Sequence, residues 1–403
     1  MPGFIHGRKR NKMLNYKFSI SCMRLVSGLA GLVFLLAGCA MPPTVIKPAV
    51  APVAPPTRVE RGIEPNYSVQ RIHFATDRAA TGSHDPANYF GAKKADKISY
   101  GICEVSIPRD HRMGELEGPS VWRLEFVPDP NKHVVLAGIK TQGKTVFFDE
   151  LKKRLQASEG KKAFVFIHGF NVSFEKAARR TAQIHYDLAF TGVPIFFSWP
   201  SQSEFVRYRN DEEMAKWSEP HLKSFFFDLA THLDVDEIYV VAHSMGNRPT
   251  TRALGALFAE RPDLAKRFKE IILVAPDIDA KVFKDKIAPQ LLTANRRVTL
   301  YASSNDKALK FSKFINGGNR LGDADPSIVV LPGMDSIDAS NVETDLLGHS
   351  YYADARSVLS DLFEVVRDTG SATARSLLEE VLTPMGHFWR FKPKQDIGTP
   401  STR

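Results

Sequence analysis

Six short apolar runs, separated mostly by helix-like segments, constrain the fold of this 403-residue chain more than any other feature. Each run is almost continuously apolar, and together they occupy 163–167, 193–197, 238–242, 271–275, 298–302 and 328–331. Strands of this kind are buried on both faces, and the helices between them cover those faces. The runs therefore predict a mostly parallel, doubly wound sheet with its functional residues at the carboxyl ends of the strands.

The segments around these runs add helices and further strands. Residues 174, 177, 178, 181, 184 and 188 share one helical face behind Ser173, a suitable N-cap, and residues 222, 225, 226 and 229 repeat the spacing. Between Val69 and Thr141 the pattern becomes strand-like, with Gly and Pro between the runs at 72–75, 102–107, 122–127 and 134–136. This part predicts antiparallel β structure before the parallel sheet.

The third apolar run leads directly into His243-Ser244-Met245-Gly246. The serine nucleophile of an α/β-hydrolase occupies such a strand-to-helix turn, which requires small residues two positions away on each side. Ala242, in place of the usual first Gly, and Gly246 meet that requirement. We therefore predict that Ser244 is a nucleophile, although an ordinary turn with an exposed serine is an alternative. The ring of Pro249 would clash with an α-helical carbonyl four residues earlier, so we expect a distorted first turn.

A serine hydroxyl needs a base to take its proton. In this fold the chain order is Ser, then Asp or Glu, then His, and only His349 and His387 follow Ser244. His349 lies in the loop after the last apolar run, whereas His387 lies in the basic C-terminal tail. His349 is the predicted base.

The base in turn needs an acid to orient it. Asp306 comes shortly after the run 298–302, two runs beyond the nucleophile run, and is the predicted acid. Asp277 and Asp279 follow the intervening run and remain alternatives. Asp335 and Asp338 lie close to His349 in sequence and are further competitors.

The oxyanion of an acyl-transfer reaction needs two backbone N–H donors. One donor is predicted at Met245, the residue after the nucleophile. The other is predicted at Phe170, in His168-Gly169-Phe170-Asn171 after the first apolar run. We interpret His168 as a structural histidine that bonds the loop backbone, because it precedes the nucleophile in the chain.

These motifs together resemble the bacterial alpha/beta-hydrolase family of unknown function formerly called DUF900. The motifs are Phe166-Ile167-His168-Gly169-Phe170-Asn171-Val172, Phe197-Ser198-Trp199-Pro200-Ser201, Ala242-His243-Ser244-Met245-Gly246-Asn247-Arg248, Ser303-Ser304-Asn305-Asp306 and Gly348-His349-Ser350-Tyr351, with Thr76-Asp77-Arg78 and Tyr100-Gly101 before them. The resemblance covers about residues 70–365 and implies the α/β-hydrolase fold with Ser, Asp and His in the roles above. It supplies no substrate, and the chain departs from it at Pro249 and after about residue 370.

The N-terminus is typical of a bacterial lipoprotein signal. Basic residues precede an apolar run at 25–37, which is short for a membrane span and ends in Leu36-Ala37-Gly38-Cys39, a lipobox. The sequence predicts a signal peptide at 1–38, a lipid on Cys39 and a Pro-rich tether at 39–66, with a transmembrane anchor as the alternative. A hydrolase domain at 67–370 and a C-terminal helix with a basic tail at 371–403 follow. We expect the protein in the cell envelope, anchored in the outer membrane and facing the periplasm.

Charge and composition argue against several other functions. The formal charge is +9, but six Lys and Arg lie in residues 1–38, so 9 − 6 leaves only +3 for the rest. A modest excess of this size does not indicate nucleic-acid binding. The three cysteines form no metal motif, and no dinucleotide or phosphate-binding loop occurs, so we expect neither metal nor cofactor.

The chain is therefore interpreted as a serine hydrolase that acts on a small-molecule or lipid carboxylic ester. The aromatic residues Phe170, Trp199, Phe205 and Trp217 are candidates for an acyl pocket. A serine peptidase or amidase, and a non-catalytic lipoprotein that uses the same scaffold for binding, are the alternatives.

Overall fold

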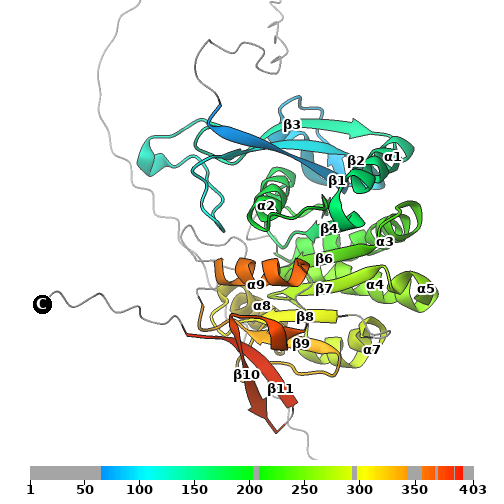
Figure 1. Cartoon of the computed structure of the whole chain (residues 1–403), viewed down its shortest axis with the longest axis vertical. Coiled ribbons are helices and arrows are strands. Elements are labelled where there is room, and N and C mark those ends of the chain that lie inside the picture. Colours follow the sequence, from blue (N-terminus) through cyan, green and yellow to red (C-terminus); the bar gives the residue numbers. More distant parts are fainter. Residues whose placement is uncertain are drawn as a thin grey trace, which may run out of the picture. The chain divides into compact units, whose positions relative to one another are not determined.

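An eleven-stranded sheet organises the part of the chain that the computed structural model describes, which comprises residues 65–202, 208–292, 297–342, 356–367, 371–384 and 386–393 (Figure 1). The strand order is β10-β11-β9-β8-β7-β6-β4-β5-β1-β2-β3. Its parallel centre consists of β4 (Lys162–Ile167), β5 (Val193–Ser198), β6 (Glu237–His243), β7 (Phe268–Val274), β8 (Arg297–Ala302) and β9 (Met334–Asp338). Five of these strands coincide with the predicted apolar runs.

Helices cover both faces of this sheet, as the apolar runs predict. One face packs against α1 (Lys144–Ala157), α3 (Tyr208–His232), α4 (Asn247–Glu260), α5 (Pro262–Ala265) and α7 (Ala288–Leu291). The other packs against α2 (Phe174–Asp187), α8 (Lys307–Asn316) and α9 (Arg356–Val366). The shorter helical segments are η1 (Pro86–Asn88), η2 (Val121–Arg123), η3 (Glu159–Lys161), η5 (Ser244–Gly246), α6 (Ala280–Val282), η6 (Phe283–Ile287) and η7 (Ala372–Ala374).

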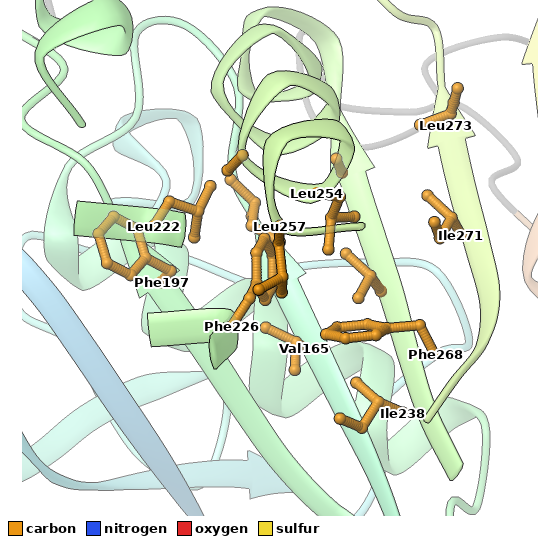
Figure 2. Close-up of a cluster of buried hydrophobic side chains, with 14 of the residues drawn as sticks. Val165, Phe197, Leu222, Phe226, Ile238, Leu254, Leu257, Phe268, Ile271 and Leu273 are labelled. Carbon is orange, nitrogen blue, oxygen red and sulfur yellow. The ribbon is translucent and has the colours of Figure 1, made fainter. Parts of the chain in front are cut away.

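Alternate residues of each central strand enter opposite layers of the core. Val165 of β4 packs beneath α3 and α4, whereas Phe166 enters the layer that contains α2 and α9. Figure 2 shows the first layer, in which Phe226 of α3 and Leu257 of α4 lie over strand residues such as Ile238. Burial on both faces explains why these strands read as continuous apolar runs.

The N-terminal part forms β1 (Tyr67–Ala80), β2 (Phe90–Pro108) and β3 (Val135–Gln142), which pair antiparallel with one another as predicted. β1 also pairs parallel with β5, so this part extends the main sheet. The predicted strand at 122–127 is wrong. Residues 121–123 form η2, and Leu124 has a φ of 56°, which is incompatible with an extended strand.

Two predictions near the C-terminus also need correction. Residues 328–331 form no strand, although Ile328 and Val329 are buried, and the last central strand is β9 instead. The predicted C-terminal helix is a hairpin of β10 (Leu378–Thr383) and β11 (Gly386–Phe391). β11 pairs parallel with β9, because Phe388 and Phe391 bury their rings against opposite layers of the core.

Several sequence predictions lie outside the described residues, namely the signal peptide, Cys39, nearly all of the tether, Phe205 and His349. Within the described part, every helix is too short or too polar to cross a bilayer. Cys103 is a buried free thiol of β2 whose pKa is raised by burial.

Candidate active site

Ser244 stands at a strained turn directly after β6. Its φ is 48°, a left-handed value that a non-glycine residue adopts only when its surroundings impose it. The residue is 6% exposed and begins the short 3-10 turn η5. The distortion expected near Pro249 is the 3-10 turn η5, which separates β6 from α4. Because α4 begins at Asn247, Pro249 lies in its first turn, where no intrahelical N–H bond is needed.

Two glycines allow the turn and the loop after β4 to touch. A Cβ atom on Gly246 would lie 2.2 Å from the carbonyl oxygen of His168. A Cβ atom on Gly169 would lie 2.9 Å from the Cβ atom of Ser244. The loop at 168–171 therefore lies directly against the nucleophile candidate, and Phe170 is the next residue after the contact. Met245, the other donor candidate, is in the first turn of η5, where backbone N–H groups point away from the helix.

The carbonyl oxygen of Ser244 is held from two sides. It accepts a bond from the backbone N–H of Asp277 at 3.2 Å and one from the side-chain amide of Asn247 at 3.0 Å. The same amide of Asn247 donates to the carbonyl oxygen of Val274, the last residue of β7, at 3.2 Å. The sequence analysis did not identify Asn247 as a site residue, although Asn247 belongs to the motif that contains Ser244.

The side chain of Arg78 holds the loop after β4 in place. The sequence analysis did not identify Arg78 as a site residue. It is 1% exposed, and its guanidinium donates to the carbonyl oxygen of Val172 at 2.7 Å, the hydroxyl of Ser198 at 2.8 Å and the carbonyl oxygen of Ser201 at 3.0 Å. Burial lowers the pKa of Arg78 to about 10, so the group stays charged at neutral pH. This cation joins the ends of β1, β4 and β5.

His168 is a structural residue of this network. Its Nε2 atom lies 3.0 Å from the Ser198 hydroxyl, and its ring stacks on Trp199 at 5.1 Å between centroids. The indole N–H of Trp199 donates to the His168 carbonyl oxygen at 2.7 Å. Burial, and then the charge of Arg78, lower the pKa of His168 to about 3, so the ring is neutral at physiological pH.

Asp306 lies after β8, at the same carboxyl edge of the sheet as Ser244. Its Oδ1 atom accepts the N–H of Leu309 at 2.9 Å and so caps α8. The chain that leaves β9 is tied beside it, because Ser340 Oγ accepts the N–H of Ser304 at 2.8 Å and the Ser340 carbonyl accepts the amide of Asn305 at 2.7 Å. His349 follows this point in the chain.

Comparison with protein families decides the assignment of the fold. Residues 144–367, which are 224 of the 403, match the family described as alpha/beta hydrolase of unknown function (DUF900). The chain belongs to this family. The resemblance expected from the motifs and the α/β-hydrolase fold are thereby confirmed.

Solved structures and curated proteins add little to this assignment. The structure of two esterases from Rhizomucor miehei shares 11% identity with a TM-score of 0.33, and covers 75% of this chain and 83% of its own. The metagenomic carboxylesterase EstE1 shares 11% identity with a TM-score of 0.30, and the match covers 76% of this chain and 90% of EstE1. A prolyl endopeptidase structure shares 11% identity with a TM-score of 0.27, and the match covers 67% of this chain and 35% of the endopeptidase. TM-scores this low carry no argument about function. No curated protein matches the chain.

The competing acids Asp277 and Asp279 of this α/β-hydrolase also have bonded partners. Asp277 is 2% exposed, and its carboxylate accepts the hydroxyl groups of Tyr208 and Ser312 and pairs with Arg248. Asp279 caps α6 through the N–H groups of Lys281 and Val282. Both alternatives thus have structural roles, as does Asp306, which caps α8.

The remaining competitors lie on or near the C-terminal hairpin. Asp338 pairs with Arg390, and Asp335 lies 3.7 Å from Arg375. His387, the competing base, is an exposed residue of β11 beside Glu380. The structure thus ties all three to the sheet edge formed by β9 and the hairpin.

The proposed acyl-pocket aromatics differ in their surroundings. Trp199 is fully buried against His168 and cannot contact a substrate, whereas Phe170 is 5% exposed and packs edge-on against Tyr208. Trp217 is half-buried, with the Lys94 ammonium 3.9 Å from its ring centroid. A cavity of about 520 Å³ between β2, α1 and α3 does not border Ser244. Within the described residues, no group of three or more His, Cys, Asp and Glu side chains could hold a metal ion.

Proposed function

We propose that this chain is a serine hydrolase that cleaves carboxylic esters of a small molecule or lipid through an acyl-enzyme. The observation that carries the proposal is the strained Ser244 turn, with the loop of Gly169 and Phe170 packed directly against it. In the proposed mechanism Ser244 attacks the acyl carbon, and the N–H groups of Met245 and Phe170 stabilise the oxyanion.

His349 is the proposed base and Asp306 the acid that orients it. The described chain reaches Val342, two residues after Ser340, which bonds to Ser304 and Asn305. His349 is seven residues further on, a span of at most about 25 Å when fully extended. This reach is ample for a return to the carboxyl edge of the sheet. Neutral His349 would accept the Ser244 proton and later donate it to the leaving group.

An ester is the proposed substrate class, with an amide as the alternative; in both cases His349 would protonate the leaving group. Neither a metal nor a cofactor is required for this reaction. We further propose that the protein is a lipoprotein of the bacterial cell envelope, anchored through Cys39 and facing the periplasm. The lipobox and the Pro-rich segment behind it support this proposal.

A fluorophosphonate probe and p-nitrophenyl esters of graded chain length test the proposed function. Wild type should bind the probe covalently and hydrolyse an ester. Ser244→Ala, His349→Ala and the double variant should lose similar activity, because each change disables the same proton transfer. Asp306→Asn should lower turnover by up to about 10⁴-fold, since it favours the wrong imidazole tautomer.

His387→Ala is the matched control, and Asp277→Asn tests the competing acid. His387 is exposed on the hairpin, so its variant should retain full activity. A folded wild type that neither binds the probe nor cleaves any ester or amide would contradict the proposal and favour the binding scaffold. Cleavage of amides alone would favour the peptidase alternative, and loss of turnover in Asp277→Asn with full activity in Asp306→Asn would overturn the choice of acid.

A further inference from the structure

The segment between β2 and β3, cyan in Figure 1, exposes four large apolar side chains. We call them the apolar tip: Trp122 is 98% exposed, Leu124 78%, Phe126 73% and Val127 76%. Single apolar residues on a surface are ordinary, but a group of four within six positions indicates a contact with something outside the domain.

Local bonds hold the tip in an ordered turn. The N–H groups of Arg123 and Glu125 both donate to the carbonyl oxygen of Ser120, at 2.9 and 3.0 Å. The Glu125 carboxylate accepts the N–H of Ser120 at 3.3 Å and lies 3.1 Å from Nε2 of His133. Leu124 adopts a φ of 56° within this turn. The exposure of these side chains is therefore built into the loop.

The base of the segment is fixed to α2. The ring of His111 is bonded to Glu117 through Nδ1 and, at 2.9 Å, to Asp187 through Nε2. Arg179 of α2 donates to the Glu117 carbonyl oxygen at 2.9 Å, and the N–H of Gly114 donates to Asp187 at 2.7 Å. The tip thus projects from a rigid base.

The N-terminal tether enters the domain at this same base. The carbonyl oxygen of Asn66 accepts the N–H of Arg109 at 2.9 Å, and the N–H of Asn66 donates to the side chain of Asn131 at 3.1 Å. Arg109 and Asn131 lie at the two ends of the segment that carries the tip. Asn66 is therefore bonded to both ends of the segment that carries the apolar tip.

We propose that the apolar tip inserts into the surface of a lipid bilayer, the one to which Cys39 is anchored. The inference rests on the proposed lipid attachment and goes beyond it by assigning the docking surface. Tryptophan favours the headgroup region, and the leucine and phenylalanine can enter the acyl boundary. Arg112 and Arg123 are exposed but pair with Glu115 and Glu125, so the apolar side chains carry the proposed insertion.

The tether alone would leave the domain free to move. The 27 residues from Cys39 to Asn66 could extend about 80 Å in a polyproline II conformation. Insertion of the tip would instead orient the domain against the membrane. Weak insertion suffices, because the tether makes it an intramolecular event at high effective concentration.

Quenching by brominated lipid tests the proposal on the purified full chain in phosphatidylethanolamine–phosphatidylglycerol vesicles. Trp199 and Trp389 are buried and Trp217 is half-buried, so Trp122 is the tryptophan that bromine on the lipid acyl chains should reach. Brominated vesicles should quench wild-type fluorescence, and Trp122→Phe should abolish most of that quenching. Leu124→Asp with Phe126→Asp should also suppress the quenching of Trp122. Phe314→Asp, on the equally exposed Phe314 of α8, is the matched control and should not.

The outcomes separate the tip from the anchor and from the active site. A chain that carries the lipid but shows no quenching of Trp122 overturns the proposal and leaves the anchor intact. Quenching of Trp122 in a chain without lipid on Cys39 supports insertion of the tip and contradicts the proposed lipid anchor. A dimer that dissociates in the tip variant, without quenching, shows that a second copy covers the tip and overturns lipid docking. Unchanged fluorophosphonate labelling of the tip variants keeps the result independent of Ser244.

Discussion

Substitution of Gly169 by alanine tests whether the contact between the loop after β4 and Ser244 matters for catalysis. The added Cβ atom would lie 2.9 Å from the Cβ atom of Ser244 and 2.9 Å from Nδ1 of His243. Carbon atoms in contact prefer about 3.5–4.0 Å, so the loop must retreat by roughly 0.5–1 Å. The His168 carbonyl cannot follow freely, because Trp199 holds it at 2.7 Å. The shift therefore falls on Phe170.

The expected magnitude follows from the proposed role of the Phe170 N–H as an oxyanion donor. Loss of one oxyanion donor costs about 10²–10³ in kcat, equivalent to about 3–4 kcal/mol of transition-state stabilisation. KM should change little, because the donor acts on the developing oxyanion. Overpacking at this site should also lower the free energy of unfolding by about 1–3 kcal/mol.

The assay is steady-state hydrolysis of a p-nitrophenyl ester, with the rate of fluorophosphonate labelling as a second readout, at a temperature where both proteins are folded. Gly143→Ala is the control, because a Cβ atom there meets nothing within 4 Å and the backbone φ is −66°. Its kcat should equal that of wild type. A folded Gly169→Ala variant that keeps kcat within about threefold would refute the assignment of Phe170 to the oxyanion site.

Two further predictions concern the base of the apolar tip and the anchor. Burial alone would lower the pKa of His111, but its hydrogen bonds to Asp187 and Glu117 outweigh that effect and raise it to about 9. Since the folded pKa lies above the unfolded value, about 3 kcal/mol of stability is present below pH 6.5 and is lost as the pH rises to 9. His111→Gln should therefore lower Tm strongly at pH 6 and little at pH 9.5; an equal loss at both would contradict the charged state. Labelling with a palmitate analogue should mark wild type but not Cys39→Ala, and equal labelling would exclude lipidation at that cysteine.

The central sheet could be predicted from sequence because one physical rule governs it. Strands such as 163–167 and 238–242 are buried on both faces, so a continuous apolar run both marks the strand and gives its class. The turn at Ser244 was predictable for a related reason. Its small neighbours are a local steric requirement, and the 2.2 Å approach at Gly246 shows how strict it is.

The predictions were wrong where apolar residues do not mark a strand of the sheet, or where a strand depends on a distant partner. The alternation at 122–127 is typical of a strand, but those side chains face outward and the backbone at Leu124 is left-handed. Ile328 and Val329 fill the core without pairing to a strand. The hairpin at 378–391 is a β edge, which depends on a distant partner in β9 that local periodicity does not reveal.

The residues that support the site could not be predicted either, because their hydrogen-bond partners are distant in the sequence. Arg78 precedes His168 by 90 positions, and nothing local indicates that its guanidinium would reach the loops after β4 and β5. Asn247 is near Ser244 in the chain, but its second acceptor is Val274 on the next strand. Hydrogen bonds across such separations follow from the folded topology and have no sequence periodicity.

These supporting residues explain how the strained turn can persist. A left-handed φ at a non-glycine residue costs roughly 1–2 kcal/mol, so Ser244 needs contacts that favour this conformation over a relaxed one. The bonds from Asp277 and Asn247 to its carbonyl oxygen supply them on one side, and Gly169 and Gly246 admit the loop on the other. Arg78 and Trp199 hold that loop before any substrate arrives. In the proposed reaction the oxyanion donors therefore need no reorganisation as charge develops, which is the condition under which fixed dipoles stabilise a transition state most.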